Sequence, residues 1–164
     1  MIENAWGFHS RSSKSLKIAL ICTHGGHLTE TLQLLEAFIE HDIFFVTHHS
    51  IRDEEVQKIA PVYFLDNMAE KPSSIPIVIL NALFILIREK PDVILSLGAD
   101  IALPFYIWGR LLSSKTIFIE SYCRIESLSR TGRIAYWLVD IFWVQWPKLL
   151  SQCGTKARYK GAVI

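Results

Sequence analysis

Two glycines and two histidines lie together near the start of the chain, in the stretch LKIALICTHGGHLTETLQLL. Gly25 and Gly26 permit positive φ angles and close approach of a ligand, and the free amides at the start of a following helix attract an anion, usually a phosphate. A diphosphate is therefore a natural occupant of this loop. A structural turn that binds nothing is the alternative, because the dinucleotide fingerprint G-x-G-x-x-G is absent.

His27 ends this loop, and an imidazole with a pKa of about 6.5 can accept a proton at physiological pH. Such a base suits the deprotonation of a sugar hydroxyl during attack. Glu30 follows three residues later and is placed to orient or polarise the ring, although a carboxylate in the first helical turn, favoured by the helix dipole, is equally consistent. We expect His24 to pack or to hydrogen-bond within the turn.

No metal site or cofactor is expected. His48 and His49 are adjacent, but no carboxylate or cysteine accompanies them at a spacing typical of metal ligands, and we interpret both as loop residues.

Two further loops carry polar residues directly after apolar runs. Asp100, in SLGAD, is placed to accept hydrogen bonds from the hydroxyls of a ligand, or else to cap the helix expected from Ile101. Glu120 ends the run TIFIE and begins a polar loop that includes Arg124, whose guanidinium fits a phosphate or a carboxylate. An ion pair of Arg124 with Glu120 or Glu126 is the alternative.

Alternating apolar strands and helices must position these loops. Strands are predicted at 16–22, 43–47, 62–65, 93–96, 116–120 and 141–146, and helices at 28–40, 53–59, about 73–90, 101–112 and 133–139. Continuous apolar strands between helices predict an α/β, Rossmann-like parallel sheet with helices on both faces. Ligands of such sheets bind at the carboxyl ends of the strands, where the loops above lie.

Composition restricts the possible partners. A chain of 164 residues is long enough for one domain, and a formal charge of +1 gives no general attraction to nucleic acid. Hydrophobic content of 51% and a mean hydropathy of +0.28 indicate apolar surface that faces a partner or lipid. Three widely spaced cysteines favour a reduced, cytosolic setting. We expect a flexible tail at 1–15, a domain at 16–152 and a partner-docking, strand-like tail at 153–164.

One apolar segment bears on membranes. No run reaches the roughly 18 uninterrupted apolar residues of a spanning helix. The nearest, at 75–87, is flanked by Lys71, Arg88 and Lys90, and is predicted to touch lipid or else to be a buried core helix. The first fifteen residues lack the apolar core of a secretory signal.

Several of these motifs resemble a known family. GGHLTE, LGADIALPF, the run KTIFIESYCRIESLSRTGRIAYWLVDIFWVQWP and the terminal CGTKARYKGAVI are similar to the acceptor-side, membrane-recruiting subunits of two-part UDP-N-acetylglucosamine transferases. These subunits serve N-glycan assembly, and similar chains serve bacterial and archaeal exopolysaccharide assembly. The similarity covers nearly everything from Leu16 onward.

The resemblance implies the acceptor-binding, N-terminal half of a GT-B glycosyltransferase, with the donor-binding half on a separate chain. Gly25, Gly26 and His27 match the family's glycine-histidine loop, with His27 as the base, while Glu120 and Arg124 match its E-S-x-x-R loop. The implied reaction moves a sugar, expected to be N-acetylglucosamine, from a UDP-sugar to a polyprenyl-diphosphate-linked sugar with inversion.

The resemblance also implies a protein that is inactive without its partner. Eukaryotic members carry an N-terminal membrane helix that this sequence does not show, so a peripheral protein on the cytoplasmic face of the membrane is expected. Two alternatives are a noncatalytic membrane scaffold for a catalytic partner and a free-standing nucleotide-binding domain.

Overall fold

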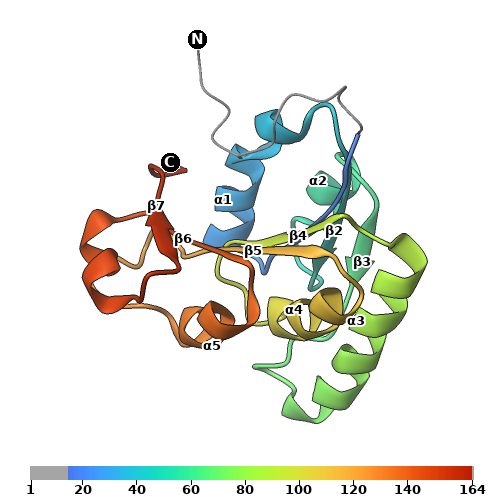
Figure 1. The fold of residues 1–164 in the computed structure, drawn as a ribbon. Coiled ribbons are helices and arrows are strands. Elements are labelled where there is room, and N and C mark those ends of the chain that lie inside the picture. Colours follow the sequence, from blue (N-terminus) through green and yellow to red (C-terminus); the bar gives the residue numbers. More distant parts are fainter. Residues whose placement is uncertain (1–14, 164) are drawn as a thin grey trace.

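The computed structural model describes residues 15–163, which build one seven-stranded parallel sheet (Figure 1). Its strand order is β3-β2-β1-β4-β5-β6-β7. The strands are β1 (Lys17–Ile21), β2 (Asp42–Thr47), β3 (Val62–Phe64), β4 (Val93–Ser96), β5 (Lys115–Ile119), β6 (Ile141–Val144) and β7 (Ala157–Tyr159). All six predicted strands are present, and all of them run in the same direction.

Helices cover both faces of the sheet, as predicted (Figure 1). One face carries α1 (Gly26–Gln33), the 3₁₀ turn η1 (Leu35–Phe38) and α2 (Asp53–Gln57). The other carries α3 (Ile75–Glu89), α4 (Ala102–Leu111) and α5 (Arg130–Leu138), with η2 (Pro72–Ser74) before α3 and η3 (Pro147–Gln152) after β6. The expected helix at 28–40 is shorter than predicted, because the chain leaves the α-helix after Gln33 and continues as η1.

The core consists of two clusters, one on each side of the sheet. Successive residues of a strand point to opposite faces. On β1, Ile18 and Leu20 belong to the cluster on the α1 side, whereas Ala19 and Ile21 belong to the cluster on the α3 side. This arrangement explains why the strands read as continuous apolar runs rather than as alternating ones.

Local signals set the ends of the helices next to the loops of interest. α3 has a proline in its first turn and ends at Lys90, whose left-handed φ of 47° precedes Pro91. α5 begins at Arg130, three residues earlier than predicted, because the Ser129 side chain caps it by accepting a hydrogen bond from the Gly132 amide at 2.8 Å.

The C-terminal segment belongs to this chain's own sheet. β7 pairs in parallel with β6, so Ala157 lies beside Phe142 and Tyr159 beside Val144. After β7, Gly161 adopts a φ of +108°, and Val163 packs on the core cluster of the α1 side. The expected strand-like tail thus contains a strand, but this strand pairs within the chain, and docking of the segment onto a partner stays a prediction. The predicted flexible tail lies outside the described residues except for Ser15.

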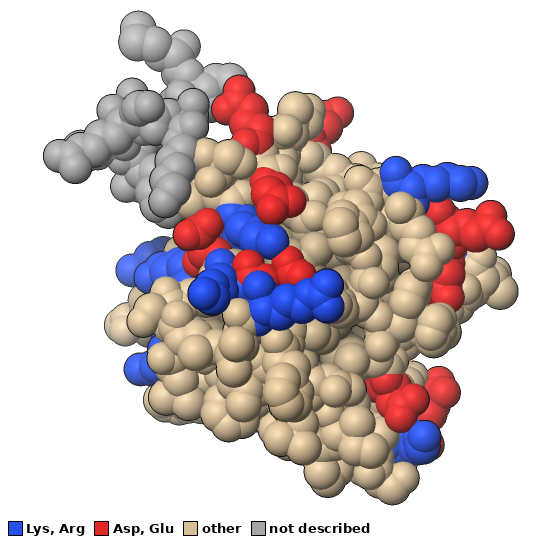
Figure 2. Space-filling view, turned by 90° about the vertical axis from the view of Figure 1, so that its right-hand side faces the viewer, with Lys and Arg blue, Asp and Glu red and all other residues tan. Residues whose placement is uncertain are grey.

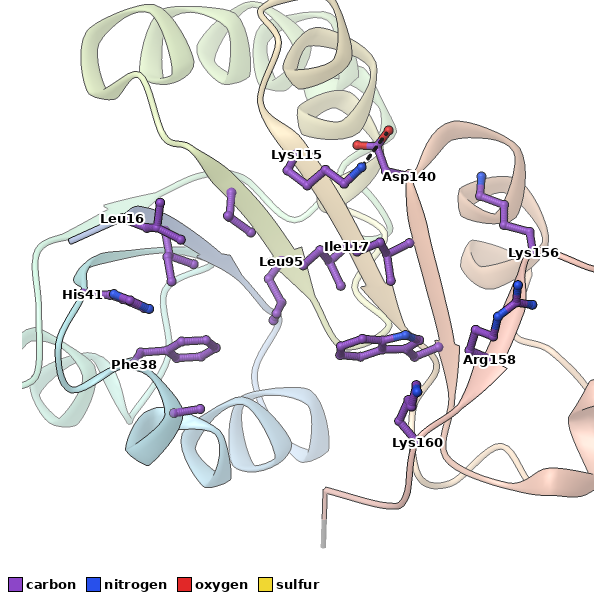
Figure 3. A pocket seen from close by; sticks show the side chains of 15 residues that line it. Leu16, Phe38, His41, Leu95, Lys115, Ile117, Asp140, Lys156, Arg158 and Lys160 are labelled. Carbon is purple, nitrogen blue, oxygen red and sulfur yellow. Dashed lines mark ion pairs between the residues drawn. The ribbon is translucent and has the colours of Figure 1, made fainter. Parts of the chain in front are cut away.

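Among residues 15–163, much of the sheet on the α1 side lacks a helical cover. A cavity of about 600 Å³ lies there over β4, β5 and β6, and we call it the sheet cavity (Figure 3). Leu95, Ile117 and Trp143 form part of its apolar floor, and Phe38 closes one side. Lys115, Lys156, Arg158 and Lys160 place positive charge along the opposite side, where Lys115 pairs with Asp140 at 3.7 Å.

The three helices of the other face expose a second apolar surface. α3 buries one stripe, which contains Val78, Ala82, Ile85 and Leu86. Its outward stripe and its neighbours on α4 and α5 form what we call the apolar helix face, which consists of Ile77, Leu80, Phe84, Ile87, Ile107, Leu111, Ile134 and Trp137. Figure 2, which looks onto the α3 side, shows a broad area free of Lys, Arg, Asp and Glu, with charged side chains around its borders.

α3 is therefore core along one stripe and exposed along the other, and contact of the exposed stripe with lipid stays a prediction. Together with η2 it forms a segment, Pro72–Glu89, that has the length and apolar composition of a membrane-crossing helix, with a mean hydropathy of 1.5 and 28% of the segment buried. The sequence criterion of an uninterrupted apolar run did not identify this segment as a possible membrane-crossing helix. Its buried stripe, however, is part of the domain core.

Candidate active site at the carboxyl edge of the sheet

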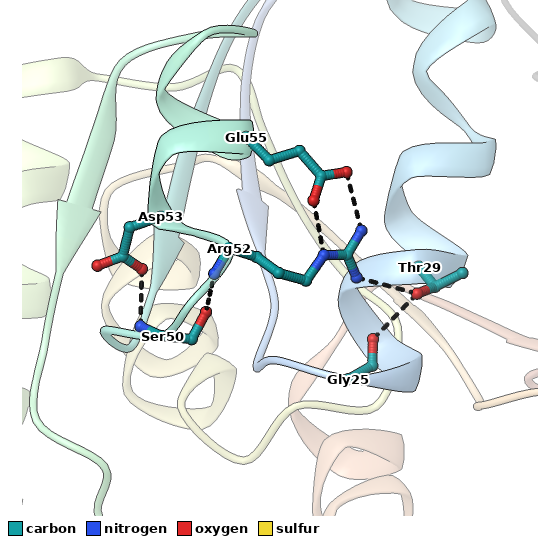
Figure 4. Close-up of polar contacts among 6 residues, drawn as sticks. All are labelled: Gly25, Thr29, Ser50, Arg52, Asp53 and Glu55. Carbon is teal, nitrogen blue, oxygen red and sulfur yellow. Dashed lines mark hydrogen bonds and ion pairs between the residues drawn. The ribbon is translucent and has the colours of Figure 1, made fainter.

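The β1–α1 loop presents open backbone at the carboxyl edge of the sheet. Gly25 adopts a φ of +77°, Gly26 begins α1, and a Cβ added at either position would meet no atom within 4 Å. Thr29 holds the loop, because its hydroxyl donates to the Gly25 carbonyl at 3.2 Å (Figure 4). The loop thus has the conformation and the free space that the sequence predicted for anion binding.

Arg52, at the start of α2, lies beside this loop (Figure 4). Its Nη1 donates to the Thr29 hydroxyl at 3.2 Å, while Nε and Nη2 hold both carboxylate oxygens of Glu55 at 2.6 and 2.9 Å. Arg52 was not among the residues predicted for the site, because nothing in the spacing of residues 29 and 52 shows that α1 and α2 lie side by side.

His27 is held from both sides of its ring. Nδ1 shares a hydrogen bond of 2.7 Å with the Thr23 hydroxyl. Nε2 faces Gly98 in the loop after β4, so closely that a Cβ added to Gly98 would lie 2.8 Å from it. When Nδ1–H donates to Thr23, Nε2 is the unprotonated nitrogen and is free to accept a proton.

The surroundings of His27 favour its neutral form. Burial lowers the pKa of its imidazole, the charges of Glu30 and Asp100 oppose this effect, and the charge of Arg124 adds to it. A neutral imidazole at physiological pH is the form that a general base requires.

Glu30 forms a different set of contacts from those expected. Its side chain is 2% exposed and accepts hydrogen bonds from Ser121 Oγ at 2.8 Å, from the Tyr122 amide at 3.1 Å and from Gln145 Nε2 at 2.8 Å. It bonds neither to the His27 ring nor to the amides of its own first turn. Glu30 therefore joins α1 to the two loops that follow β5 and β6, and its influence on His27 is electrostatic.

Asp100 and Arg124 lie within electrostatic reach of His27. Asp100 is partly exposed, and its Oδ1 accepts a hydrogen bond from the adjacent Ile101 amide at 2.9 Å. Arg124 is exposed, and among residues 15–163 its side chain makes no ion pair or hydrogen bond, since Glu126 pairs with Lys148 instead. A cationic side chain without a partner is thus available near the imidazole.

Glu120 lies beneath this edge. It is fully buried, and its carboxylate accepts hydrogen bonds from the amide and hydroxyl of Ser129 at 2.9 and 3.1 Å and from the Ser121 amide at 3.1 Å. Burial raises the pKa of this carboxyl. Only glycine fits at position 132, because an added Cβ would lie 2.1 Å from a Glu120 oxygen. Glu120 therefore anchors the loop that carries Arg124.

Three other histidines lie near this site. The His24 and His48 rings are 6.2 Å apart, and among residues 15–163 both His24 nitrogens and His48 Nε2 are buried without hydrogen-bond partners. His24 thus packs rather than hydrogen-bonds. His49 bonds Asp53 at 2.8 Å. No group of three His, Cys, Asp or Glu side chains in the described part of the chain is arranged to hold a metal ion.

Comparisons with solved structures agree with the fold. MurG from Acinetobacter baumannii superimposes with a TM-score of 0.72 at 14% identity, over 88% of this chain and 45% of MurG. UDP-N-acetylglucosamine 2-epimerase from Rickettsia bellii gives 0.67 at 18% identity, over 92% of this chain and 46% of the epimerase. The chain thus spans less than half of either protein. Its fold is that of the N-terminal half of a GT-B glycosyltransferase, as predicted.

Comparisons of sequence identify the family. The human UDP-N-acetylglucosamine transferase subunit ALG14 is 29% identical over 92% of this chain and 84% of its own length. The subunit of the same name from Mus musculus is 26% identical over 95% of this chain and 87% of its own length. A family model described as "Oligosaccharide biosynthesis protein Alg14 like" matches residues 65–163, which is more than half of the chain. The chain therefore belongs to the Alg14-like family of oligosaccharide biosynthesis proteins.

Proposed function

We propose that this chain is the acceptor-binding subunit of a two-part glycosyltransferase that moves N-acetylglucosamine from a UDP-sugar to a polyprenyl-diphosphate-linked sugar with inversion. The observation that carries the proposal is His27, an imidazole held by Thr23 beside an open glycine loop at the carboxyl edge of the sheet, where burial lowers its pKa. The names of the relatives support a transferase subunit.

In the proposed reaction, His27 Nε2 takes the proton of the acceptor hydroxyl while its oxygen attacks the anomeric carbon of the donor sugar. The new carbon–oxygen bond forms as the bond to UDP breaks, and attack from the opposite side inverts the anomeric centre. The amides of Gly25 and Gly26 and the guanidinium of Arg124 hold the acceptor diphosphate, because the glycine backbone is open to a ligand and the Arg124 side chain is exposed beside it. Asp100 accepts hydrogen bonds from acceptor hydroxyls.

The donor half is a separate partner chain in this proposal. The names of the relatives contain the word "subunit", and the chain spans less than half of the solved glycosyltransferase MurG. We place the partner against the C-terminal segment and the sheet cavity beside it, since β7 contributes Arg158 to the cavity wall and Lys160 follows it. The cavity pairs an apolar floor with a basic side, which suits a partner segment with apolar and acidic side chains.

The membrane is the second partner in this proposal, and the chain lies peripherally on its cytoplasmic face. The apolar helix face is the contact surface, because Phe84 is 67% and Trp137 is 77% exposed, although both are large and apolar. Arg88 and Lys90 lie at the end of α3, where they suit anionic lipid headgroups.

The catalytic role is tested by transfer from UDP-N-acetylglucosamine to a short-chain polyprenyl-diphosphate sugar with both subunits present. We expect His27→Ala to lower kcat by about 10²- to 10⁴-fold. His49→Ala, which removes an exposed histidine from a neighbouring loop, is the matched control and should keep normal turnover. Near-normal transfer by His27→Ala would eliminate the base and favour the noncatalytic scaffold.

Membrane binding is tested separately by flotation with vesicles that contain anionic lipid. Phe84→Ser should reduce the bound fraction, whereas Ile39→Ser should not, because Ile39 is equally apolar and exposed but lies next to η1 on the other face. Equal binding of both variants would refute the assignment of the apolar helix face. Nucleotide binding by the chain without its partner would favour the free-standing nucleotide-binding domain.

A further inference from the structure

Gln145 connects the C-terminal segment to the loops around His27. It follows β6 directly and is 1% exposed. Its Nε2 donates to Glu30 at 2.8 Å and to the Glu120 carbonyl at 3.1 Å, while its Oε1 accepts from the Val163 amide at 2.8 Å. One buried side chain therefore contacts a residue of α1, the residue that follows β5 and a residue near the end of the chain.

The orientation of this amide is determined by its partners. Both neighbours of Nε2 are acceptors, a carboxylate and a carbonyl, whereas the neighbour of Oε1 is an N–H donor. In a flipped amide, the oxygen would face the two acceptors and the NH₂ group would face the N–H donor, so these hydrogen bonds would be lost. A carboxylate at position 145 would likewise oppose Glu30, and an apolar side chain would leave the buried Glu30 without one of its donors. Glutamine meets both requirements.

From Gln145 the contacts continue to His27. Glu30 accepts the Gln145 bond and also holds Ser121 and Tyr122 at the start of the loop after β5. Ser121 Cβ lies 3.4 Å from the position of a Cβ added to Gly98, and the same position is 2.8 Å from His27 Nε2. Ser121, Gly98 and the imidazole are thus neighbours. Glu30 also lies one turn after His27 on α1.

The outer end of this chain of contacts is the segment 160–163. Gly161 turns the backbone with its φ of +108°, and Val163 then places its side chain on the core cluster that contains Leu28 of α1. Its amide reaches Gln145 at the same point. The segment that we expect to meet the partner subunit is therefore hydrogen-bonded to the residue that supports Glu30.

We propose that Gln145 is a positioning residue that couples the seating of segment 160–163 to the arrangement of Glu30, Ser121 and His27. A partner that contacts this segment then acts on the geometry at His27 without touching it. The catalytic consequence rests on the proposed function, whereas the coupling itself does not.

The coupling is tested by NMR on the full chain without its partner. Val163→Pro removes the amide hydrogen that Gln145 accepts and also changes the side chain, whereas Val163→Ala changes the side chain but keeps that hydrogen, so the comparison isolates the hydrogen bond. We expect Val163→Pro to shift the amide signal of Tyr122 and the ring ¹⁵N signals of His27, and Val163→Ala to leave both in place. Unmoved signals in Val163→Pro would overturn the proposal.

The route through Gln145 is tested by a double-variant cycle with Gln145→Leu. If the coupling passes through this amide, adding Val163→Pro to Gln145→Leu produces no further shift, because the contact is already lost. A further shift of undiminished size would show another route and refute the assignment. If Gln145→Leu does not fold, Gln145→Glu is used in its place. The glutamate keeps an oxygen that accepts from the Val163 amide but places its other oxygen against the Glu30 carboxylate, where it cannot donate a hydrogen bond.

The catalytic consequence is measured with saturating partner subunit. Loss of one hydrogen bond to a buried carboxylate predicts a fall in kcat of about tenfold for Gln145→Leu, with complex formation retained on size-exclusion chromatography. Unchanged kcat would overturn the positioning role. Normal turnover by His27→Ala, together with the NMR shifts described above, would instead refute the proposed function and leave the coupling intact.

Discussion

Replacing Gly26 with alanine separates ligand binding from structure at the proposed diphosphate loop. Gly26 is the first residue of α1, its φ is not positive, and an added Cβ would meet no atom within 4 Å. Alanine should therefore fit without strain and, by restricting the unfolded chain, raise the free energy of unfolding by up to about 1 kcal/mol. Any loss of activity then has to come from the ligand.

The expected loss is that of one charge-assisted hydrogen bond. If the acceptor diphosphate lies against this backbone, the new methyl group holds it away from the loop amides, at a cost of about 1.5–3 kcal/mol, or roughly 10- to 150-fold in kcat/KM. Transfer rates at varied acceptor concentration, with the partner subunit saturating, measure this value, and urea unfolding measures stability.

Gly25→Ala is the informative comparison, because its φ of +77° adds backbone strain to any effect on the ligand. A Gly26→Ala variant that keeps normal kcat/KM and gains stability would show that no ligand approaches this backbone. The loop would then be the structural turn that the sequence left open.

The remaining predictions concern the imidazole, its neighbour after β4 and the thiols. Gly98→Ala should lower kcat by about 10²-fold, because its φ of +99° and the 2.8 Å approach to His27 Nε2 force the ring to move; a stable variant with normal turnover would contradict this. Because burial lowers the pKa of His27, kcat/KM should fall only below a pH of about 6.5, and a pH–rate profile measures this effect. The neutral imidazole also contributes to the free energy of unfolding above that pH, and this contribution should be lost as the pH falls from about 6.5 toward the lower pKa of the folded state. Urea titrations at several pH values measure this second effect. A thiol reagent should modify exposed Cys123 first and Cys22 only after unfolding, because burial raises the pKa of Cys22 to about 12; mass spectrometry of partly labelled protein shows the order.

The sequence predicted the sheet and its carboxyl edge well, and for a physical reason. Strands buried on both faces leave continuous apolar runs such as KIALI and VILS, which are visible without an alignment. Parallel strands then place the loops that follow them along one edge, and this brought His27 and Gly98 together as expected. β7 had no such signal, because its three residues ARY contain one buried side chain.

The connections within the site could not be predicted from spacing. Glu30 and Gln145 are separated by 115 positions, and only the folded sheet brings the end of β6 next to α1. The pattern near Glu30 suggested a local role, as partner of His27 or as a first-turn carboxylate, whereas its hydrogen bonds are to distant loops. A lone glutamine after a buried run, in IFWVQW, was the available signal for its partner.

The open side of the sheet has a practical consequence for handling this protein. In the part of the chain that the structure describes, both the sheet cavity and the apolar helix face are uncovered, and each is a surface on which other molecules in solution can associate. Such a chain is expected to self-associate when it is produced in excess, and to remain dispersed when its counterpart is made at the same time. Matched synthesis of the two polypeptides is therefore expected to give more soluble material than mixing after separate purification.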